Sequence, residues 1–325
     1  MRILVTGGAG YIGSVIVEDL VRLGHETTVY DSLDRGHAGS VHPAATLVRG
    51  TVGERELLAQ TLRERDIEAV IHMAAFIEVG ESVHHPEIFF QNNVVGSLEV
   101  LRAMIDTGVK NLVFSSTAAL YGDPQRIPIT EDDMPQPTNP YGESKLLVER
   151  MLRWLAEAHS MTITSLRYFN AAGATEMNGE DHTPESHLIP IVLRAALTGE
   201  ELRIHGTDYP TKDGTCVRDF VHVLDLAQAH VLALGRRDAG MRVYNVGSGE
   251  GYSVREVMET VQRITGKTLN IVTGPRRAGD QIATVASPLR IRTDLGWQPQ
   301  HAGLDEIISS AWRWRLAHPN GYGSL

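Results

Sequence analysis

A glycine-rich turn close to the N-terminus constrains the fold of this chain more than any other feature. Gly7, Gly10 and Gly13 follow a G-x-x-G-x-x-G spacing, directly between the apolar run Ile3–Thr6 and a helical pattern. Glycines there permit a tight turn and close backbone approach, so a pyrophosphate can meet the N–H groups and positive dipole at the helix start. This context favours a dinucleotide site over a glycine turn without a ligand.

The first half of the chain alternates strand-like runs with helical patterns. After the turn, Ile12, Ile16, Leu20 and Leu23 form one apolar helical face, and Gly24 is suited to end that helix. Such alternation predicts an α/β fold with a Rossmann-type doubly wound parallel sheet and a smaller, interleaved α/β substrate domain. The expected strands are Ile3–Thr6, Thr27–Tyr30, Thr46–Val48, Ala69–His72, Leu112–Ser115 and Ile163–Tyr168.

The later part of the chain has a looser pattern. Two long helical patterns, Pro86–Thr107 and Tyr141–His159, flank a proline-rich loop, and the pattern is irregular from about residue 171 to 214. Strand-like stretches return at Asp219–Val223 and Val243–Gly247, and the last expected helix is Val254–Ile264, with Ser253 as its N-cap. We expect an NAD-binding domain of residues 1–170 with about 219–248, and a substrate domain of about 171–218 with 249–325.

Charge and cysteine content exclude several classes of protein. The formal charge of −10 disfavours a nucleic-acid footprint, which needs a concentrated basic face. The single cysteine, Cys216, cannot form an intrachain disulfide and fits a reducing compartment. The N-terminal apolar run is too short for a signal peptide or a membrane span, so we expect a cytoplasmic protein. Fourteen histidines occur without recognised ligand spacing, so no metal site is expected.

An acidic residue follows the second expected strand. Asp31 stands where a carboxylate accepts both hydroxyls of an adenosine ribose and repels a 2′-phosphate, which favours NAD over NADP. Arg35 weakens this preference slightly, because a guanidinium near the ribose tolerates a 2′-phosphate. The alternative for Arg35 is a solvated side chain in a polar loop.

A tyrosine and a lysine form a candidate proton-transfer pair. Tyr141 and Lys145 are four residues apart at the start of a helical pattern, so they share a face. The lysine ammonium, together with the positive ring of an oxidised nicotinamide, should lower the tyrosine pKa from about 10 and make proton abstraction feasible. The hydroxyl cluster Ser115–Thr117 follows a strand, at the sheet edge where ligands bind. A solvated helix pair is the alternative reading.

Together these motifs resemble the extended short-chain dehydrogenase/reductase superfamily, and most closely its UDP-glucose 4-epimerase family. The resemblance covers nearly the whole chain, and its most specific part is the D-Y-P-T-x-D-G-T-x-V-R-D segment at 208–219. The other motifs on which the resemblance rests are VTGGAGYIGS at Val5–Ser14, VGESVHHP at Val79–Pro86, NNVVGS at Asn92–Ser97, FSSTAALYGD at Phe114–Asp123, NPYGESK at Asn139–Lys145, RYFNAAGA at Arg167–Ala174 and RRAGD at Arg276–Asp280.

The resemblance implies a set of site residues by position. Its catalytic residues are Thr117 as the hydroxyl, Tyr141 as the base and Lys145 as its support. The cofactor contacts that it implies are Gly7, Gly10, Tyr11, Ile12, Gly13, Asp31, Thr51, Val52, Asn93, Ser115, Tyr141, Lys145 and Tyr168. The substrate contacts that it implies are Thr117, Tyr141, Asn170, His187, Leu188, His205, Arg218, Arg277 and Asp280, with the two arginines clamping a diphosphate and Asp280 holding the uridine ribose.

Several positions depart from the family pattern. Thr51 replaces an Asp that accepts from the adenine amino group, and Ile77 or Phe76 stands where many members carry a Lys near the cofactor ribose and phosphate. Cofactor affinity could therefore be lower. His187 stands where some relatives have Asn, and His205 where some have an aromatic residue; an imidazole still stacks or donates. For Arg218, a surface ion pair with Asp219 is the alternative.

The reaction that the resemblance implies is the reversible C4 epimerisation of UDP-glucose and UDP-galactose through a 4-keto intermediate, with NAD as hydride carrier. Nucleotide-sugar 4,6-dehydratases carry an Asp-Glu pair after the threonine, whereas this chain has Ala118 and Ala119; the Glu of decarboxylating relatives is also missing. The alternatives are another nucleotide-sugar epimerase or a non-catalytic NAD-binding sensor.

Two further expectations come from the resemblance. Thr284 occupies the position that gates the 2-position of the sugar, where a bulky aromatic residue excludes an N-acetyl group, so UDP-N-acetylglucosamine is a candidate substrate; simple packing is the alternative. A homodimer is expected, in which Pro86–Thr107 and Tyr141–His159 pair across the interface as a four-helix bundle. Neither nucleic acid nor membrane is an expected partner.

Overall fold

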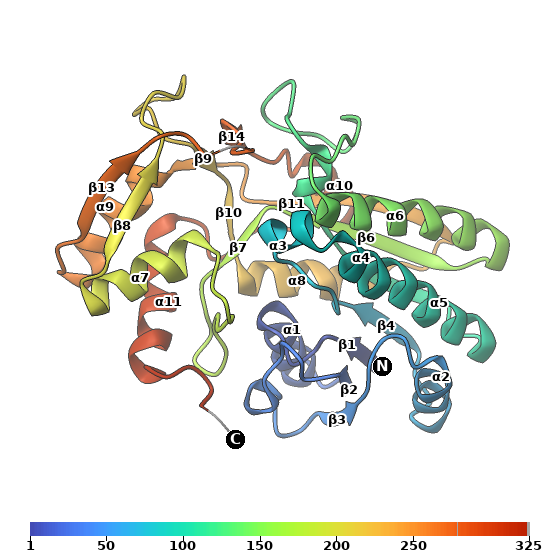
Figure 1. Cartoon of the computed structure of the whole chain (residues 1–325). Helices are drawn as coiled ribbons and strands as arrows, with labels where there is room; N and C mark the ends of the chain where they lie inside the picture. The colour runs from blue at the N-terminus through green and yellow to red at the C-terminus, as the bar shows by residue number, and fades with distance from the viewer. Residues whose placement is uncertain (278, 324–325) are drawn as a thin grey trace.

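The computed structural model describes residues 1–277 and 279–323 and centres on a seven-stranded sheet (Figure 1). The strand order is β11-β6-β5-β4-β1-β2-β3, and every neighbouring pair is parallel. The six strands expected in the first half are all present, with ends that differ by at most two residues. The strands are β1 Arg2–Thr6, β2 Glu26–Asp31, β3 Thr46–Arg49, β4 Ala69–His72, β5 Asn111–Thr117, β6 Thr162–Tyr168 and β11 Gly240–Val246.

Helices cover both faces of this sheet because its strands are apolar on both sides. On one face, α1 (Tyr11–Arg22) and α8 (Val223–Leu234) contact each other and share one buried cluster with the strands. On the other face lie α2 (Arg55–Glu64), α5 (Gly96–Thr107) and α6 (Pro140–His159), which form a second cluster. The predicted doubly wound α/β fold is confirmed.

The first helix follows its sequence pattern closely. Ile16 and Leu20 are fully buried, and Gly24 adopts a left-handed φ of +79° just beyond the helix end. Leu23, which the pattern placed on the same apolar face, is 45% exposed because the helix ends before it.

The helix expected over residues 86–107 is continuous but not uniform. It consists of α4 (Pro86–Phe89), the π-helical segment η2 (Phe90–Val95) and α5. The backbone keeps right-handed helical angles at both junctions. π-Helical turns inside α-helices are frequent at functional sites, and this one lies beside the short helix α3 (Val79–His84) at the carboxyl edge of the sheet.

Most of the remaining elements form a smaller lobe with its own core, whereas α10 (Leu289–Leu295) packs on the large sheet, with Ile291 in the cluster of α1 and α8. Its helices α7 (Leu188–Thr198), α9 (Val254–Thr265) and α11 (Leu304–Ala317) share one buried cluster. Its strands pair in three small sheets, β7–β10, β12–β9–β14 and β8–β13. Their bounds are β7 Asn170–Ala172, β8 Glu201–His205, β9 Val217–Arg218, β10 Phe220–His222, β12 Tyr252–Ser253, β13 Asn270–Gly274 and β14 Ala283–Thr284.

Two expectations about the second half were incomplete. The predicted last helix is present as α9, with Ser253 in a capping box, but α10 (Leu289–Leu295) and α11 follow it. The stretch from 171 to 214 contains α7 and β8, and α7 was missed because its sequence, LIPIVLRAALT, is apolar almost throughout and shows no helical alternation. We keep the two-domain division with its expected boundaries as a proposal. Among the described residues no helix has both the length and the apolar character to span a membrane.

Candidate active site

A cavity of about 440 Å³ lies at the carboxyl edge of the large sheet, against the smaller lobe. It begins where β1 and β4 are neighbours, the point at which the strand order reverses and where ligands bind in open α/β sheets. Most of the predicted site residues line it. These are Gly7, Gly10, Tyr11, Ile12, Gly13, Asp31, Thr51, Val52, Ser115, Thr117, Tyr141, Tyr168, Asn170, His187 and Arg218.

The glycine turn is built so that no side chain fits inside it. Gly7 has a φ of +70°, and a Cβ there would lie 2.5 Å from the Ala74 nitrogen. A Cβ on Gly13 would lie 2.2 Å from the Gly7 carbonyl oxygen. The N-cap of α1, Gly10, supplies no side-chain cap, and the first turn of α1 has no acidic residue. The first backbone N–H groups of α1 are therefore free to bind an anion from the cavity side.

Asp31 ends β2 with part of its hydrogen-bonding capacity still available. Its Oδ2 accepts from the Ala9 N–H at 3.0 Å, and its Oδ1 accepts from the Leu33 N–H at 2.9 Å. Burial raises the pKa of Asp31, while these two backbone bonds act in the opposite direction. A carboxylate has about four lone-pair sites, so two remain for the hydroxyls of a ribose.

Arg35 also lines the cavity, but its guanidinium forms ion pairs with two glutamates. Its Nε lies 3.5 Å from Glu78 Oε1 and its Nη2 lies 3.8 Å from Glu81 Oε2. Two carboxylates beside this guanidinium disfavour a 2′-phosphate, so the preference for NAD over NADP is strengthened.

Two positions on the cofactor side that depart from the family pattern lie on the cavity wall. Thr51 and Ile77 both line the cavity, and neither supplies a charge there. The Thr51 N–H donates to Glu54 Oε2 at 2.6 Å, and the Thr51 carbonyl accepts from the Tyr30 hydroxyl at 3.1 Å. The backbone of Thr51 is therefore fixed even though its side chain cannot replace a carboxylate.

Thr117 and Tyr141 are brought into direct contact. Thr117 is the last residue of β5, and Tyr141 lies in the first turn of α6, which the Asn139 side chain caps by accepting from the Gly142 N–H at 2.8 Å. Both side chains line the cavity. Burial raises the pKa of Tyr141 to about 12, and the neighbouring Thr117 hydroxyl acts in the opposite direction.

Lys145 is buried behind the cavity wall rather than on it. Its Nζ donates to the Ser115 carbonyl at 2.9 Å, and burial lowers its pKa to about 7. Among the described residues no hydrogen bond joins Lys145 to Tyr141. The expected lowering of the Tyr141 pKa is therefore not produced by Lys145, because the desolvation of the phenol is the larger effect.

Asn93, an expected cofactor contact, is placed elsewhere. Its Oδ1 accepts from the Phe76 N–H at 2.9 Å, and its Nδ2 donates to the Phe76 carbonyl at 3.0 Å and to Ser144 Oγ at 3.1 Å. These bonds hold the segment after β4 against α6. The neighbouring Asn92 lines the cavity instead. The sequence NN left the choice of asparagine open, and only the π-helical turn settles which one faces the cavity.

Tyr168 is held by a residue that sequence reasoning missed. Its hydroxyl contacts the His230 imidazole from α8 and also bonds with Ser115. Burial lowers the pKa of His230 to about 4, so this histidine is neutral near pH 7. No local motif marks His230, because its role depends on α8 packing beneath β6.

The substrate side of the cavity includes Arg218 and Thr284, which are register partners in β9 and β14. Arg218 donates to the Val217 and Gln281 carbonyls at 2.9 and 2.8 Å. The ion pair with Asp219 considered from the sequence does not form, since Asp219 is buried and its carboxylate accepts from the N–H groups of Ser248, Gly249 and Ala286.

Four predicted substrate residues, Leu188, His205, Arg277 and Asp280, do not line the cavity. Arg277 instead forms an ion pair with Asp280, 2.8 Å between Nη2 and Oδ1. The expected clamp of two arginines is therefore represented on the wall by Arg218 alone. The RRAGD motif also includes Ala278, which lies outside the described residues.

His187 occupies the cavity wall at the N-cap position of α7. Burial by itself lowers its pKa, but the Glu180 carboxylate outweighs burial and raises the pKa of His187 to about 9. The same carboxylate has its own pKa held down to about 2 by His187 and His182, against the effect of burial. His187 is therefore positively charged at neutral pH, as an anion-binding side chain requires.

Known proteins with the same kind of fold and site are similar to this chain over its whole length. The NAD dependent epimerase/dehydratase family model matches residues 3–247. A UDP-glucose 4-epimerase of Halalkalibacterium halodurans is 47% identical over 329 residues, covering 100% of this chain and 98% of that protein. A crystal structure of a UDP-glucose 4-epimerase is 42% identical, with a TM-score of 0.97 and both chains covered completely. The enzyme of Bifidobacterium longum, in complex with NAD+ and UDP, is 36% identical, with a TM-score of 0.94 over 99% of this chain and 100% of that one.

Proposed function

Because the chain belongs to the NAD dependent epimerase/dehydratase family, and within it to the UDP-glucose 4-epimerases, we propose that Thr117, Tyr141 and Lys145 carry out its proton transfers. The enzyme is an isomerase that interconverts UDP-glucose and UDP-galactose at C4, with NAD as its cofactor. The single observation that supports the residue assignment best is that Thr117 and Tyr141 lie together on the wall of the cavity, close enough for the Thr117 hydroxyl to lower the pKa of the phenol.

The described residues fit NAD. The free N–H groups at the start of α1 suit a pyrophosphate, and the two remaining acceptor sites of Asp31 suit a ribose. Asn92, Ser115 and Tyr168 line the wall further along the cavity. Bound there, NAD would supply the hydride acceptor and donor for C4 of the sugar.

The protein's own task is to move one proton at the 4-hydroxyl and to hold the sugar. Tyr141 removes this proton, either directly or through Thr117. Since the buried phenol has a pKa of about 12, its ionisation needs positive charge in the closed site. The positive ring of oxidised NAD would supply it, and the bond of Lys145 to the Ser115 carbonyl fixes the end of β5. Arg218 binds the substrate diphosphate, and His187 donates to it from Nε2, because its Nδ1 faces Glu180.

The proposal is tested with the purified enzyme and its Tyr141→Phe variant, assayed for interconversion of UDP-glucose and UDP-galactose. We expect the variant to lose roughly 10²–10⁴-fold in kcat, which is the usual contribution of general acid–base catalysis. Tyr252→Phe is the matched control, because the Tyr252 hydroxyl donates to the nearby Glu250 at 2.9 Å and Tyr252 is not among the residues that line the cavity. Full activity of Tyr141→Phe refutes the mechanism. A wild type that binds NAD but converts no UDP-hexose favours the sensor.

We further propose that the enzyme accepts UDP-N-acetylglucosamine. Thr284 lines the cavity at 7% exposure, and a small side chain there leaves room beside the 2-position of the sugar. Thr284→Tyr should lower kcat/KM for the N-acetylated substrate by about 10–200-fold and leave UDP-glucose turnover nearly unchanged. A competition assay with both substrates measures the ratio, and strict discrimination by the wild type contradicts the proposal.

We also propose a homodimer through α4–α5 and α6. Three exposed apolar side chains belong to these helices and the adjoining α3, namely Val83 on α3, Ile88 on α4 and Trp154 on α6, which is 73% exposed. Trp154→Glu should convert the dimer to a monomer in size-exclusion chromatography with light scattering. Leu316→Glu is the matched control, since Leu316 is an exposed apolar residue on α11. A monomeric wild type contradicts the proposal.

A further inference from the structure

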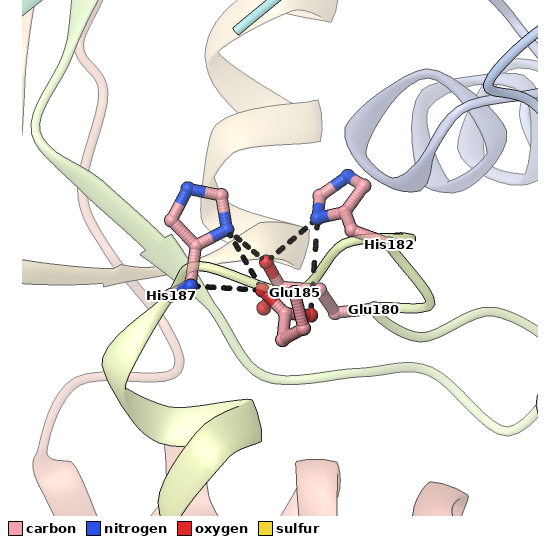
Figure 2. A group of neighbouring side chains, drawn as sticks. All are labelled: Glu180, His182, Glu185 and His187. Carbon is pink, nitrogen blue, oxygen red and sulfur yellow. Dashed lines mark hydrogen bonds and ion pairs between the residues drawn. The ribbon is translucent and has the colours of Figure 1, made fainter. Parts of the chain in front are cut away.

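A cluster of two histidines and two glutamates lies in the loop between β7 and α7. Glu180, His182, Glu185 and His187 place one ligand atom each within 4.8 Å of all the others. Figure 2 shows that both imidazoles direct a nitrogen at the carboxylates, which lie between them. The sequence predicted no metal site because the spacing E-x-H-x-x-E-x-H matches no helical ligand motif. The loop, however, folds back on itself and gathers the four side chains.

The separations within the cluster suit a tetrahedral ion. His187 Nδ1 lies 2.5 Å from Glu180 Oε1 and 3.6 Å from Glu185 Oε1. His182 Nδ1 lies 3.2 Å from Glu180 Oε1 and 4.0 Å from Glu185 Oε2. A tetrahedral zinc site with bonds of 2.0–2.1 Å has ligand–ligand edges of about 3.4 Å. The four distances lie on both sides of this value. Because Glu185 faces one histidine with Oε1 and the other with Oε2, its carboxylate must turn, and the 2.5 Å pair must separate, before one ion is enclosed.

Two buried atoms of the cluster have ion-pair contacts but no well-formed hydrogen bond within the described residues. His182 Nδ1 lies 3.2 Å from Glu180 Oε1, and Glu185 Oε2 lies 4.0 Å from His182 Nδ1. The side chains of Glu180 and Glu185 are both almost completely buried. Burying a carboxylate oxygen without a partner is costly, and native proteins rarely leave such atoms unsatisfied. A single cation among the four ligands satisfies both atoms.

We propose that Glu180, His182, Glu185 and His187 bind one divalent transition-metal ion, of which Zn²⁺ fits best. Imidazole nitrogens favour zinc and its neighbours, whereas Mg²⁺ and Ca²⁺ prefer sites made only of oxygen. Four protein ligands complete a tetrahedral shell, which is typical of a structural site rather than a catalytic one. The alternative is a metal-free ion-pair network, with both imidazoles charged against the two carboxylates.

The position of the loop indicates what the ion does. The loop is fastened to the cofactor side of the cavity, because Tyr11 donates to the Gly173 carbonyl at 2.6 Å and His37 bonds to the Asp181 carbonyl at 2.9 Å. The edge of the His182 ring also packs against Tyr11, with centroids 6.1 Å apart. His187 and His182 both line the cavity. The ion therefore fixes the loop that closes this wall.

The experiment uses the full chain, prepared without a metal-chelating tag, stripped by chelator and reloaded with Co²⁺. We expect one Co²⁺ per chain, with the intense visible absorption of tetrahedral coordination, which Zn²⁺ then displaces. Thermal unfolding followed by calorimetry should shift upward when Zn²⁺ is added, because the ion binds only the folded chain.

The variant His182→Gln/Glu185→Gln should lose both the absorption and the thermal shift. His84→Gln is the matched control, since His84 is an exposed histidine on α3, away from the cluster. Absence of a tetrahedral Co²⁺ spectrum in the wild type overturns the proposal and leaves the ion-pair network. Equal metal binding by the double variant also overturns it, since the ion would then lie elsewhere.

Discussion

The buried ion pair between Arg167 and Glu149 provides a sharp test of how the site is supported. Arg167 Nη2 and Nε lie 2.6 and 3.1 Å from the two carboxylate oxygens of Glu149. The Arg167 Nη1 donates to the Tyr121 hydroxyl at 2.7 Å, and Ser165 donates to Glu149 at 2.8 Å. The pair joins β6 to α6, the two elements that carry Tyr168 and Tyr141. It lies away from the cavity wall, so its role is structural.

Removing one partner should cost far more than removing both. Arg167→Met leaves a buried carboxylate, and Glu149→Leu leaves a buried guanidinium, and each should destabilise the protein by about 3–5 kcal/mol. For a chain of 325 residues with an unfolding entropy of about 2.1 cal/mol/K per residue, that is a fall in Tm of about 4–7 °C. The double variant should recover most of the loss, because a well-packed apolar pair needs no desolvation of charge.

Differential scanning calorimetry of the wild type, both single variants and the double variant at pH 7 measures the cycle. Activity per folded molecule should be little changed in the double variant, since neither side chain touches the cavity. Single variants that lose less than about 1 kcal/mol, or a double variant as unstable as the sum of both, would refute the reasoning.

Further predictions concern the glycine turn, the buried lysine and the two asparagines. Gly13→Ala should abolish retention of NAD on purification, because its Cβ would lie 2.2 Å from a backbone oxygen, whereas Gly80→Ala, in open space, should not. Lys145 has a pKa of about 7 in the folded protein against about 10.4 in the unfolded chain, so the unfolded chain binds more protons between these pH values. The free energy of unfolding therefore rises with pH in this range. Lys145→Met should flatten this rise in urea titrations and should abolish activity. Asn93→Ala should lower stability by about 1–3 kcal/mol in the same titrations, and Asn92→Ala should mainly weaken NAD binding.

Much of the fold was predictable because its determinants are local. Strands of the large sheet are short apolar runs bounded by turns, and α1 shows a clear helical period, so both were found. The helix α7 was missed because its sequence is apolar nearly throughout, and α10 and α11 were not predicted. Leu197 of α7 is 43% exposed, so the solvent-facing side of this helix is not marked by polar residues alone. Periodicity identifies a helix whose exposed face is polar, and it says little about a helix that is apolar on its exposed face as well.

The candidate site also contains residues that the sequence predicted and residues that only the packing could reveal. The glycine turn and Asp31 were found from their place after consecutive strands, whereas the choice between Asn92 and Asn93 was not. A change of one residue moves a side chain by about 100° around a helix, and the π-helical turn changes that angle again. No sequence rule marked His230, since its contact with β6 exists only through the packing of α8.

The sequence by itself determined the parallel sheet, the anion-binding turn and the types of residue available for proton transfer, because each follows from neighbours along the chain. The tertiary structure decided which of them meet. It placed Thr117 against Tyr141 and turned Lys145 away to the Ser115 carbonyl, so that desolvation sets the pKa of the phenol. It also folded one loop so that Glu180 and three neighbours converge. Burial and contact between distant segments govern these outcomes, and neither can be read from local pattern.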